Sequence, residues 1–481
     1  MNYQMLRYVM GQIFKLTSAL MGFPLMVALY YKDEGVLPLV VVLVPLLFAG
    51  YIMTAHKPTS QTIYAREGFV IVAFAWILLS VFGALPFVIS GAIPNFVDAL
   101  FETVSGFTTT GSTLLSDIES LPMSLLMWRS FTHWIGGMGV LVFALALLPS
   151  GSAQSMYIMR AEVPGPSVGK LVAKTQLTAR ILYGIYVFFT FLEAVLLRLT
   201  GMRWFDCVAN AFATAGTGGF AVLNNGIGGY HNVWVEVIIT VFMLIFSINF
   251  NLFYMLLIKQ FSEVVHNVEI KVFFTVYLVS TLLITWNIMP QYHGSFWHAF
   301  RYAGFTTASL CSSTGFGTAD YTLWPAFSQT ILILLMFCGA CAGSTGGGLK
   351  VARVMILFKS GLSEIRRQLN PKLISTVKLE GQVIENEQIR TQGAFFILYI
   401  IILFVSTLLL SMDRYGFDVS FSAALTALNN MGPGLGAIGP YGNFGDFTAF
   451  SKLVIIFDML VGRLEIFPVL IAFMPRTWKK A

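Results

Sequence analysis

The chain carries the polar stretch Ser105-Gly106-Phe107-Thr108-Thr109-Thr110-Gly111-Ser112-Thr113 between two strongly apolar runs. Three later stretches share its layout, with a short apolar segment before a glycine-containing polar turn and a long apolar segment after it. They are Ala215-Gly216-Thr217-Gly218-Gly219-Phe220, Ser312-Ser313-Thr314-Gly315-Phe316-Gly317 and Asn429-Asn430-Met431-Gly432-Pro433-Gly434. Aligned on Gly111, Gly218, Gly315 and Gly432, the four stretches predict a tandem repeat of long helix, short helix, polar turn and long helix.

A polar turn of this kind inside a membrane has few physical uses. Non-helical backbone is tolerated at membrane depth only where protein buries it or where it lines a water-filled cavity. Four such turns around one axis would present rings of carbonyl oxygens, which can replace the hydration shell of a cation. Glycine suits the turns because it adopts positive φ freely and lets the backbone approach an ion closely. The repeat therefore predicts a pore for a cation.

The composition is that of a polytopic membrane protein. Of the 481 residues, 57% are hydrophobic and 11% are charged, against about 25% charged in an ordinary soluble domain. Ten apolar runs are long enough to cross a hydrocarbon core of about 30 Å. They cover residues 8–31, 36–55, 68–91, 124–149, 180–200, 232–258, 271–289, 325–357, 392–412 and 449–474. Four shorter segments are expected to be re-entrant pore helices, at residues 95–108, 204–215, 296–311 and 418–430.

We therefore expect an all-α polytopic membrane protein in which four tandem helix–pore helix–helix repeats surround a central pore. The first pair of spans has no short insert, so residues 1–60 are expected to form an accessory N-terminal helical hairpin. The repeats are expected at residues 61–160, 161–262, 263–390 and 391–481. Arg7 and Lys15 before an apolar run also fit a signal peptide, but no small-residue cleavage site follows, so we expect the segment to be retained.

Charge predicts the orientation in the membrane. The net charge is +6, and with a cytoplasmic N-terminus most of the 29 Lys and Arg residues lie in segments that face the cytoplasm, as the positive-inside rule requires. The polar turns then fall on the outer side, where acidic residues would concentrate cations at a pore mouth. The basic face would contact anionic membrane lipid. Its charged loop, Lys359 to Arg390, is interpreted as a docking surface, with a solvated linker as the alternative.

Residues 325–357 form the span that departs most from a regular helix. Five of the ten residues from Gly339 to Gly348 are glycine, and each costs a helix about 1 kcal/mol relative to alanine. We expect the span to break there, and the loop that joins its halves to act as a gate. This gate is expected to include Gly343, Ser344, Thr345, Gly346, Gly347, Gly348 and Lys350. Helix packing is the alternative role; a phosphate-binding loop is excluded because Leu349 separates Gly348 from Lys350 and no strand precedes.

Two arginines are unexpected in apolar surroundings. Arg463 lies mid-span, where a charged side chain is costly and by default indicates function. We expect it to lie beneath the turns, as a barrier to a cation and a partner for carbonyl groups of the Gly343–Gly348 segment. The alternative is an ion pair, with Asp458 or with another helix, because Glu465 does not share a helix face with it. Arg301 is expected to have a buried structural partner, such as a carboxylate of a neighbouring pore helix.

Other polar side chains leave two interpretations open. Asp98 and Glu102 lie on the first short helix, whose C-terminal end would direct its partial negative charge at the pore centre; equally, both carboxylates could be merely solvated. Cys338 and Cys341 form a CxxC pair, a pattern that elsewhere indicates metal or redox chemistry. No second pair and no nearby histidine complete such a site, so packing of small residues is favoured.

Together, the four single-glycine turns, the glycine-rich broken helix and the Gly462-Arg463-Leu464-Glu465 segment resemble the Trk/Ktr/HKT superfamily of potassium transporters. The extra helical pair, Trp134-Ile135-Gly136-Gly137-Met138-Gly139 and Asn430-Met431-Gly432-Pro433-Gly434 resemble its TrkH branch. The resemblance implies a homodimer in the bacterial inner membrane, gated by a cytoplasmic nucleotide-binding ring of the TrkA type, with Arg463 as the constriction residue. It implies a K⁺-binding selectivity filter at Thr109, Thr110, Gly111, Ser112, Thr217, Gly218, Gly219, Ser313, Thr314, Gly315, Phe316, Asn430, Met431, Gly432 and Pro433.

The expected function is gated potassium uptake, with K⁺ as bound ion and cargo and no covalent cofactor. The four turns differ from one another, so we expect K⁺ and Rb⁺ to pass readily and Na⁺ less so. The alternative is an H⁺- or Na⁺-coupled secondary carrier, or symporter, of a cation or small solute, since carriers also use repeats and broken helices. An enzyme is not expected, because the six histidines are scattered, and no nucleic-acid partner is expected.

Overall fold

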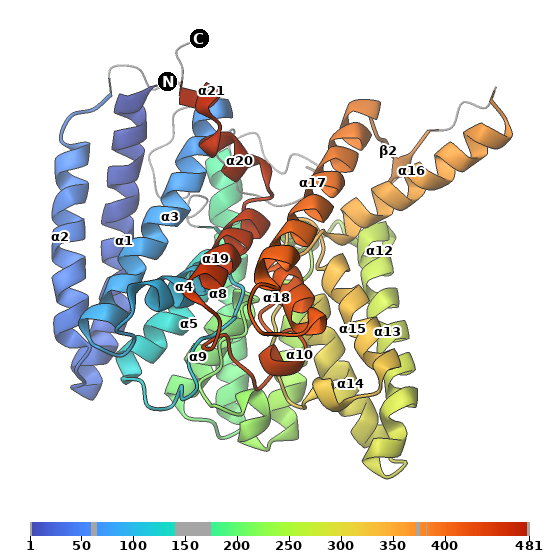
Figure 1. Ribbon diagram of the computed structural model, residues 1–481, viewed down its shortest axis with the longest axis horizontal. Helices are drawn as coiled ribbons and strands as arrows, with labels where there is room; N and C mark the ends of the chain where they lie inside the picture. Colours follow the sequence, from blue (N-terminus) through green and yellow to red (C-terminus); the bar gives the residue numbers. More distant parts are fainter. Residues whose placement is uncertain (1, 59–64, 140–174, 372–375, 381, 479–481) are drawn as a thin grey trace.

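A computed structural model describes residues 2–58, 65–139, 175–371, 376–380 and 382–478. The described chain is almost wholly helical, as predicted. Its N-terminal hairpin is α1 (Tyr3–Tyr31) and α2 (Val36–Thr54), which lie side by side at the edge of the molecule next to α3 (Figure 1). The expected span at 124–149 is described only to residue 139, and residues 150–174 of the expected cytoplasmic segment lie outside the described residues.

The four repeats have the predicted order of elements. Each begins with a long helix: α3 (Ala65–Ile89), α8 (Thr175–Leu199), α13 (Val268–Ile288) and α17 (Asn386–Leu410). Each continues with a short helix: α4 (Phe96–Phe107), α9 (Trp204–Ala215), α14 (Phe296–Cys311) and α18 (Phe417–Asn429). These bounds agree with the four predicted pore helices to within one residue.

In the first repeat, the second long helix is described as α5 (Met123–Gly137), and the description of this segment stops at residue 139. In the other three repeats the second long helix is interrupted: α10 (Val233–Phe246) is followed by α11 (Phe250–Leu257), α15 (Ala326–Cys338) by α16 (Val351–Leu369), and α19 (Ala449–Arg463) by α20 (Phe467–Phe473). We call the segment Gly339–Lys350, which joins α15 to α16, the glycine loop. The expected continuous span at 232–258 is wrong, because α10 and α11 meet at an angle of 90°. Asn249 begins α11 by accepting a hydrogen bond from the N–H of Asn251.

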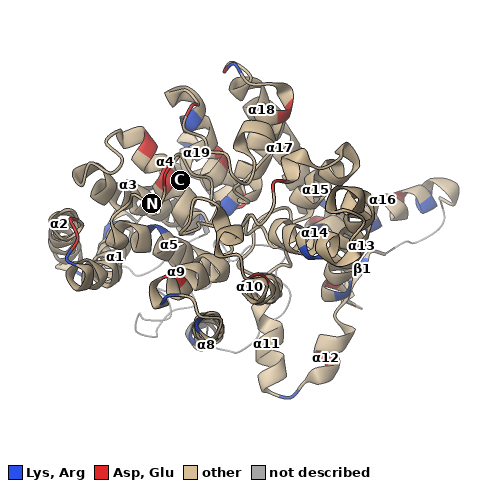
Figure 2. Cartoon of the chain, turned by 90° about the horizontal axis from the view of Figure 1, so that it is seen from below, with Lys and Arg blue, Asp and Glu red and all other residues tan. Residues whose placement is uncertain are grey.

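Among the described helices, six are long and apolar enough to cross a membrane without a break: α1, α2, α3, α8, α13 and α17. They are the hairpin and the first helix of each repeat, and the bent pair α10 and α11 would make a seventh. Charged residues are sparse along the chain, most of which is tan in Figure 2. The uninterrupted helices therefore form the membrane-spanning framework. The interrupted helices differ from them because none crosses a membrane as one straight helix.

Short elements complete the end of the molecule where both chain termini lie. They are α12 (Phe261–His266), α21 (Pro475–Trp478) and an antiparallel hairpin of β1 (Lys378–Leu379) and β2 (Gln382–Val383), in which Lys378 pairs with Val383. Helix α16 extends sideways from the bundle, and the hairpin lies between it and α17 (Figure 1). The hairpin is the one departure from an all-α chain in the described residues.

Candidate functional site

The four short helices end in the same way. One or two residues after each helix, a residue adopts the left-handed conformation, with φ of +57° at Thr109, +54° at Thr217, +58° at Ser313 and +52° at Asn430. The next N–H then bonds back to a carbonyl five residues earlier: Thr110 to Ser105, Gly218 to Ala213, Thr314 to Ser309 and Met431 to Thr426, at 2.8–3.0 Å. This is the Schellman pattern of helix termination. Threonine is β-branched and rarely adopts positive φ, so these turns are held by their surroundings.

A glycine with positive φ follows in each turn, and it lies against the next repeat. The φ values are +83° at Gly111, +75° at Gly219, +83° at Gly315 and +89° at Gly432. A methyl group on Gly111 would lie 1.8 Å from Gly218 O, on Gly219 2.0 Å from Thr314 O, on Gly315 2.1 Å from Met431 O, and on Gly432 2.7 Å from Thr110 O. The order is cyclic, so the four turns form one closed ring. The sequence alignment on Gly218 is wrong by one residue, because Gly219 is the equivalent glycine.

Side chains join the fourth turn to the first and close the ring. Ser112 Oγ donates to Gly432 O at 3.0 Å, and Asn430 Nδ2 donates to Thr110 Oγ1 at 3.0 Å. Phe316 O accepts from Ser309 Oγ at 2.8 Å within the third repeat. The predicted filter residues are therefore brought together, since each turn contacts its neighbours in the ring. No group of three or more side chains suited to a metal ion occurs in the described part of the chain, so the ring offers mainly backbone and hydroxyl oxygens.

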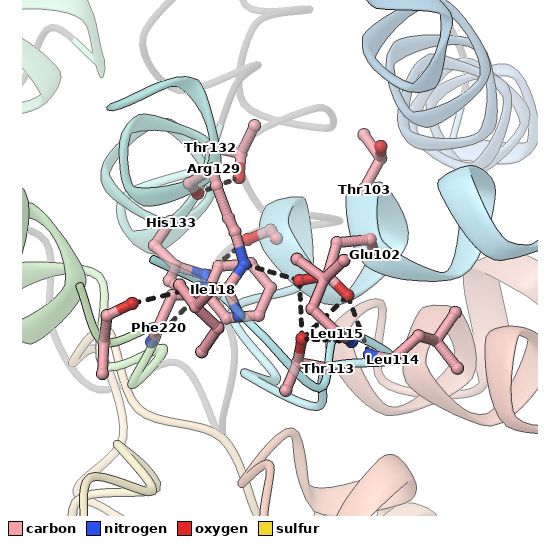
Figure 3. A network of polar contacts seen from close by, with 12 residues as sticks. Glu102, Thr103, Thr113, Leu114, Leu115, Ile118, Arg129, Thr132, His133 and Phe220 are labelled. Carbon is pink, nitrogen blue, oxygen red and sulfur yellow. Dashed lines mark hydrogen bonds and ion pairs between the residues drawn. The ribbon is translucent and has the colours of Figure 1, made fainter. Parts of the chain in front are cut away.

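Glu102 is buried, and not solvated, beside the ring of turns. It pairs with the equally buried Arg129 of α5. Its carboxylate also accepts from Thr113 Oγ1 and Leu114 N, both at 3.0 Å (Figure 3). Arg129 reaches the second repeat, because Nη1 donates to Ala221 O at 3.1 Å. The pair therefore holds the segments that leave the first and second turns. Asp98, in contrast, pairs with Lys452 of α19 at 2.8 Å near the surface.

His133, which sequence reasoning passed over as one of six scattered histidines, bridges two repeats. Its Nδ1 lies 2.7 Å from Gly106 O, and its Nε2 lies 3.3 Å from Phe220 N (Figure 3). Because a carbonyl only accepts and an N–H only donates, the imidazole of His133 is neutral with its proton on Nδ1. A methyl group on Gly218 would lie 2.3 Å from the His133 ring. The signal available in the sequence was a histidine four residues after Arg129 on an apolar helix.

The glycine loop lies in the break between α10 and α11. Gly339, Gly343, Gly348 and Lys350 have φ between +67° and +81°, which ends α15 and starts α16 abruptly. Cys341 N donates to Ser247 O at 3.1 Å, and Thr345 N donates to Phe246 O at 3.4 Å. These carbonyls belong to the end of α10, where no partner exists within the helix. The predicted break in residues 325–357 is therefore confirmed, and the loop satisfies the backbone of another broken helix.

Arg463 joins the glycine loop to the first repeat. Its guanidinium donates to Thr345 O at 2.9 Å and to Gly136 O and Gly137 O at the end of α5. The expected contact with carbonyl groups of the loop is confirmed. Of the alternative partners, Asp458 accepts from Ser406 at 2.8 Å, and Glu465 pairs with Arg353 at 3.0 Å.

The loop also touches the ring and carries a second buried cation. Gly347 N donates to Ser313 Oγ, the hydroxyl of a ring residue. The buried Lys350 ammonium donates to Gly346 O within the loop. A methyl group on Gly347 would lie 2.2 Å from Asn429 O, at the end of α18. The ring, the glycine loop and two basic side chains therefore form one continuous assembly.

Two further expectations concern Arg301 and the cysteines. The expected buried partner of Arg301 is confirmed: it is the carboxylate of Glu236, which lies on α10 and not on a pore helix. Cys338 and Cys341 are free thiols, and the described residues place no group of metal ligands near them.

These features define a class: a four-repeat helical membrane protein with a ring of polar turns above interrupted helices. The chain belongs to the TrkH family of cation transport proteins, whose family model matches residues 42–480. It is 34% identical over 489 residues to the Trk system potassium uptake protein TrkH of Escherichia coli K12, covering 100% of both chains. It is 29% identical to TrkI of Halomonas elongata, covering 98% of this chain and 96% of the relative. The crystal structure of the potassium transporter TrkH from Vibrio parahaemolyticus matches with a TM-score of 0.89 and 32% identity over 100% of both chains.

Proposed function

We propose that this protein is a gated pore for potassium uptake in the bacterial plasma membrane. The observation that carries the proposal is the closed ring, in which each glycine faces a carbonyl oxygen of the next repeat. Carbonyl oxygens at fixed positions can replace the hydration shell of a large alkali cation. The family and the printed names of the relatives, potassium uptake proteins, support K⁺ as the cargo.

The glycine loop, Lys350 and Arg463 are proposed as the gate. The loop lies directly against the ring through Gly347 and Ser313, and two positive side chains, Lys350 and Arg463, are buried with it. Positive charge at low dielectric raises the energy of a passing cation. A cation that leaves the ring must therefore displace the loop, or wait until the loop is moved.

Regulation is proposed to come from the cytoplasm, through a nucleotide-binding partner of the TrkA type and within a homodimer. Supporting this, the end of the molecule with both termini also carries the β1–β2 hairpin and the sideways helix α16 (Figure 1), and α16 contains the basic residues Lys359, Arg366 and Arg367. The positive-inside rule places that end in the cytoplasm. The Trk system names of the relatives fit a transporter that works with other components.

The decisive experiment is cation flux in proteoliposomes that contain only this protein. We expect Rb⁺ and K⁺ to enter along an imposed voltage, and Na⁺ to enter more slowly. A current that follows voltage without a proton or sodium gradient identifies a pore, whereas flux that requires either gradient would identify a coupled carrier and reject the proposal. Equal Na⁺ and K⁺ flux would reject the selectivity. Growth of a bacterium deficient in potassium uptake on low K⁺ is the companion test in cells.

A further inference from the structure

Glu269, a buried residue in the first turn of α13, contacts the glycine loop and the first turn of α16. Its Oε1 accepts hydrogen bonds from Ala342 N at 2.7 Å and from Ala352 N at 3.1 Å. Ala342 precedes Gly343, and Ala352 lies in the first turn of α16. A single carboxylate oxygen therefore connects the glycine loop to the first turn of α16.

A carboxylate fits this position for a physical reason. Helix α16 begins at Lys350, whose side chain makes no capping hydrogen bond, so its first N–H groups need a partner from elsewhere. The start of a helix carries partial positive charge and favours an anion. Because one oxygen accepts from both N–H groups, this contact restrains the glycine loop and the start of α16 relative to each other.

The same turn of α13 is attached to the β1–β2 hairpin. Asn267 begins the helix, because its Oδ1 accepts from Ile270 N at 2.9 Å. Its Nδ2 donates to the carboxylate of Glu380, which lies in the turn of the hairpin with a φ of +51°. The hairpin is also tied to α16, since Lys359 Nζ donates to Lys378 O at 2.9 Å. The surface hairpin is therefore connected to the glycine loop through two residues at the start of α13, Asn267 and Glu269.

We propose that Glu269 holds the glycine loop closed, and that displacement of the β1–β2 hairpin by a soluble partner opens the loop through Asn267 and the first turn of α13. The inference rests on the proposed gate and adds the residue that positions it. If the first turn of α13 moves, Glu269 Oε1 moves with it, and the N–H groups of Ala342 and Ala352 lose their shared acceptor at the same time. The loop then retains its contacts with α10, α11, the ring and Arg463, and loses the one that ties it to α13.

The first test compares basal Rb⁺ flux of three variants in proteoliposomes. Glu269→Ala removes the acceptor and is expected to raise flux about tenfold, as for the loss of one hydrogen bond to a charged group. Glu269→Gln keeps an acceptor oxygen and is expected to stay within about threefold of the wild type. Glu364→Gln, an exposed carboxylate on α16 that pairs with Arg367, is the matched control and is expected to change nothing. Wild-type flux in Glu269→Ala would overturn the role of Glu269.

The second test is hydrogen exchange of the full-length protein, and it does not require flux. In Glu269→Ala and in Glu380→Ala, the amides of residues 339–352 are expected to exchange faster, while the ring amides of Thr110 and Gly218 stay protected. Faster exchange in the ring as well would mean general destabilisation and would overturn the inference. Unchanged exchange in Glu380→Ala would overturn the part played by the hairpin. If the wild type passes no Rb⁺, the proposed pore fails, whereas this measurement still decides whether Glu269 fastens the loop.

Discussion

The ring of four turns and the glycine loop are both rich in glycine, yet they are fixed by different kinds of contact. The ring is fixed by main chain: each turn is the hydrogen-bonded end of a helix, and each glycine abuts a carbonyl of the next repeat. The glycine loop has main-chain bonds to the end of α10, but it is also held by side chains from other elements, namely Glu269, Ser313 and Arg463. A side chain can rotate away without unfolding a helix, whereas a helix end cannot. Under the proposed function, we therefore expect the ring to discriminate between ions and the glycine loop to move.

The largest effect is expected where the ring depends on one buried ion pair. Glu102→Ala leaves the Arg129 guanidinium buried without its partner, and breaking such a pair typically costs 3–5 kcal/mol, here about 4 kcal/mol of unfolding free energy. Asp98→Ala is the control, because its pair with Lys452 is partly exposed, with 27% of the Asp98 side chain accessible; we expect a loss of about 1 kcal/mol. Denaturant unfolding in detergent measures both. Equal losses would show that the ring does not depend on this pair.

The next effect tests whether the ring tolerates a single added methyl group. Gly315→Ala would place a methyl group 2.1 Å from Met431 O at a φ of +83°. The required shift of the third turn is expected to reduce Rb⁺ flux about a hundredfold, equivalent to about 2.7 kcal/mol. Gly184→Ala on α8 is the control, since nothing lies within 4 Å of the added atom. Retention of selective flux in Gly315→Ala would contradict the close packing of the ring.

A smaller effect, opposite in sign, is expected in the glycine loop. Arg463→Ala removes the donor to Thr345 O and to the end of α5, so basal Rb⁺ flux is expected to rise about tenfold. Deletion of residues 343–348 is expected to raise it at least as much. Arg463→Lys keeps the charge but not the planar fork of donors, and is expected to give an intermediate flux. If neither Arg463→Ala nor the deletion changes the flux, the loop is not a gate.

The smallest effect concerns pH at the surface hairpin. Partial burial raises the pKa of the Glu380 carboxyl above its ordinary value, against the opposing hydrogen bond from Asn267. A raised pKa means that the folded hairpin favours the protonated acid, so this stabilisation is complete below the ordinary pKa and is lost as pH rises through the raised one. Intrinsic-rate-corrected hydrogen exchange of residues 376–380 should therefore be slower in mild acid than at neutral pH. Glu380→Gln should abolish that dependence, and an unchanged profile would contradict it.

Much of the fold could be predicted because it depends on apolar length and repetition. The four short helices were placed to within one residue, since each is an apolar segment between a polar start and a glycine turn. The break at Gly339–Lys350 was also predictable, because five glycines destabilise a helix regardless of its surroundings.

The remaining features depend on contacts between distant segments, which periodicity does not report. The bend between α10 and α11 follows Ser247-Ile248-Asn249, whose two polar residues within an apolar run were the available signal. The equivalence of Gly219 with Gly111 depends on backbone conformation, because Gly218 is equally plausible by spacing. Glu269 resembled an ordinary charge at the end of a span, and only its two partners, far along the chain, give it a role.

The cyclic order of the turns has a consequence for how the protein is made. Gly315 faces Met431, and Gly432 faces Thr110, so two of the four sides of the ring involve the last repeat to leave the ribosome. Domains generally fold from the N-terminus during synthesis, but here the first turn can complete its contacts only after the fourth turn has been synthesised. A nascent chain that ends before residue 430 would therefore hold three inserted repeats with an open seam, and the C-terminal repeat completes the assembly.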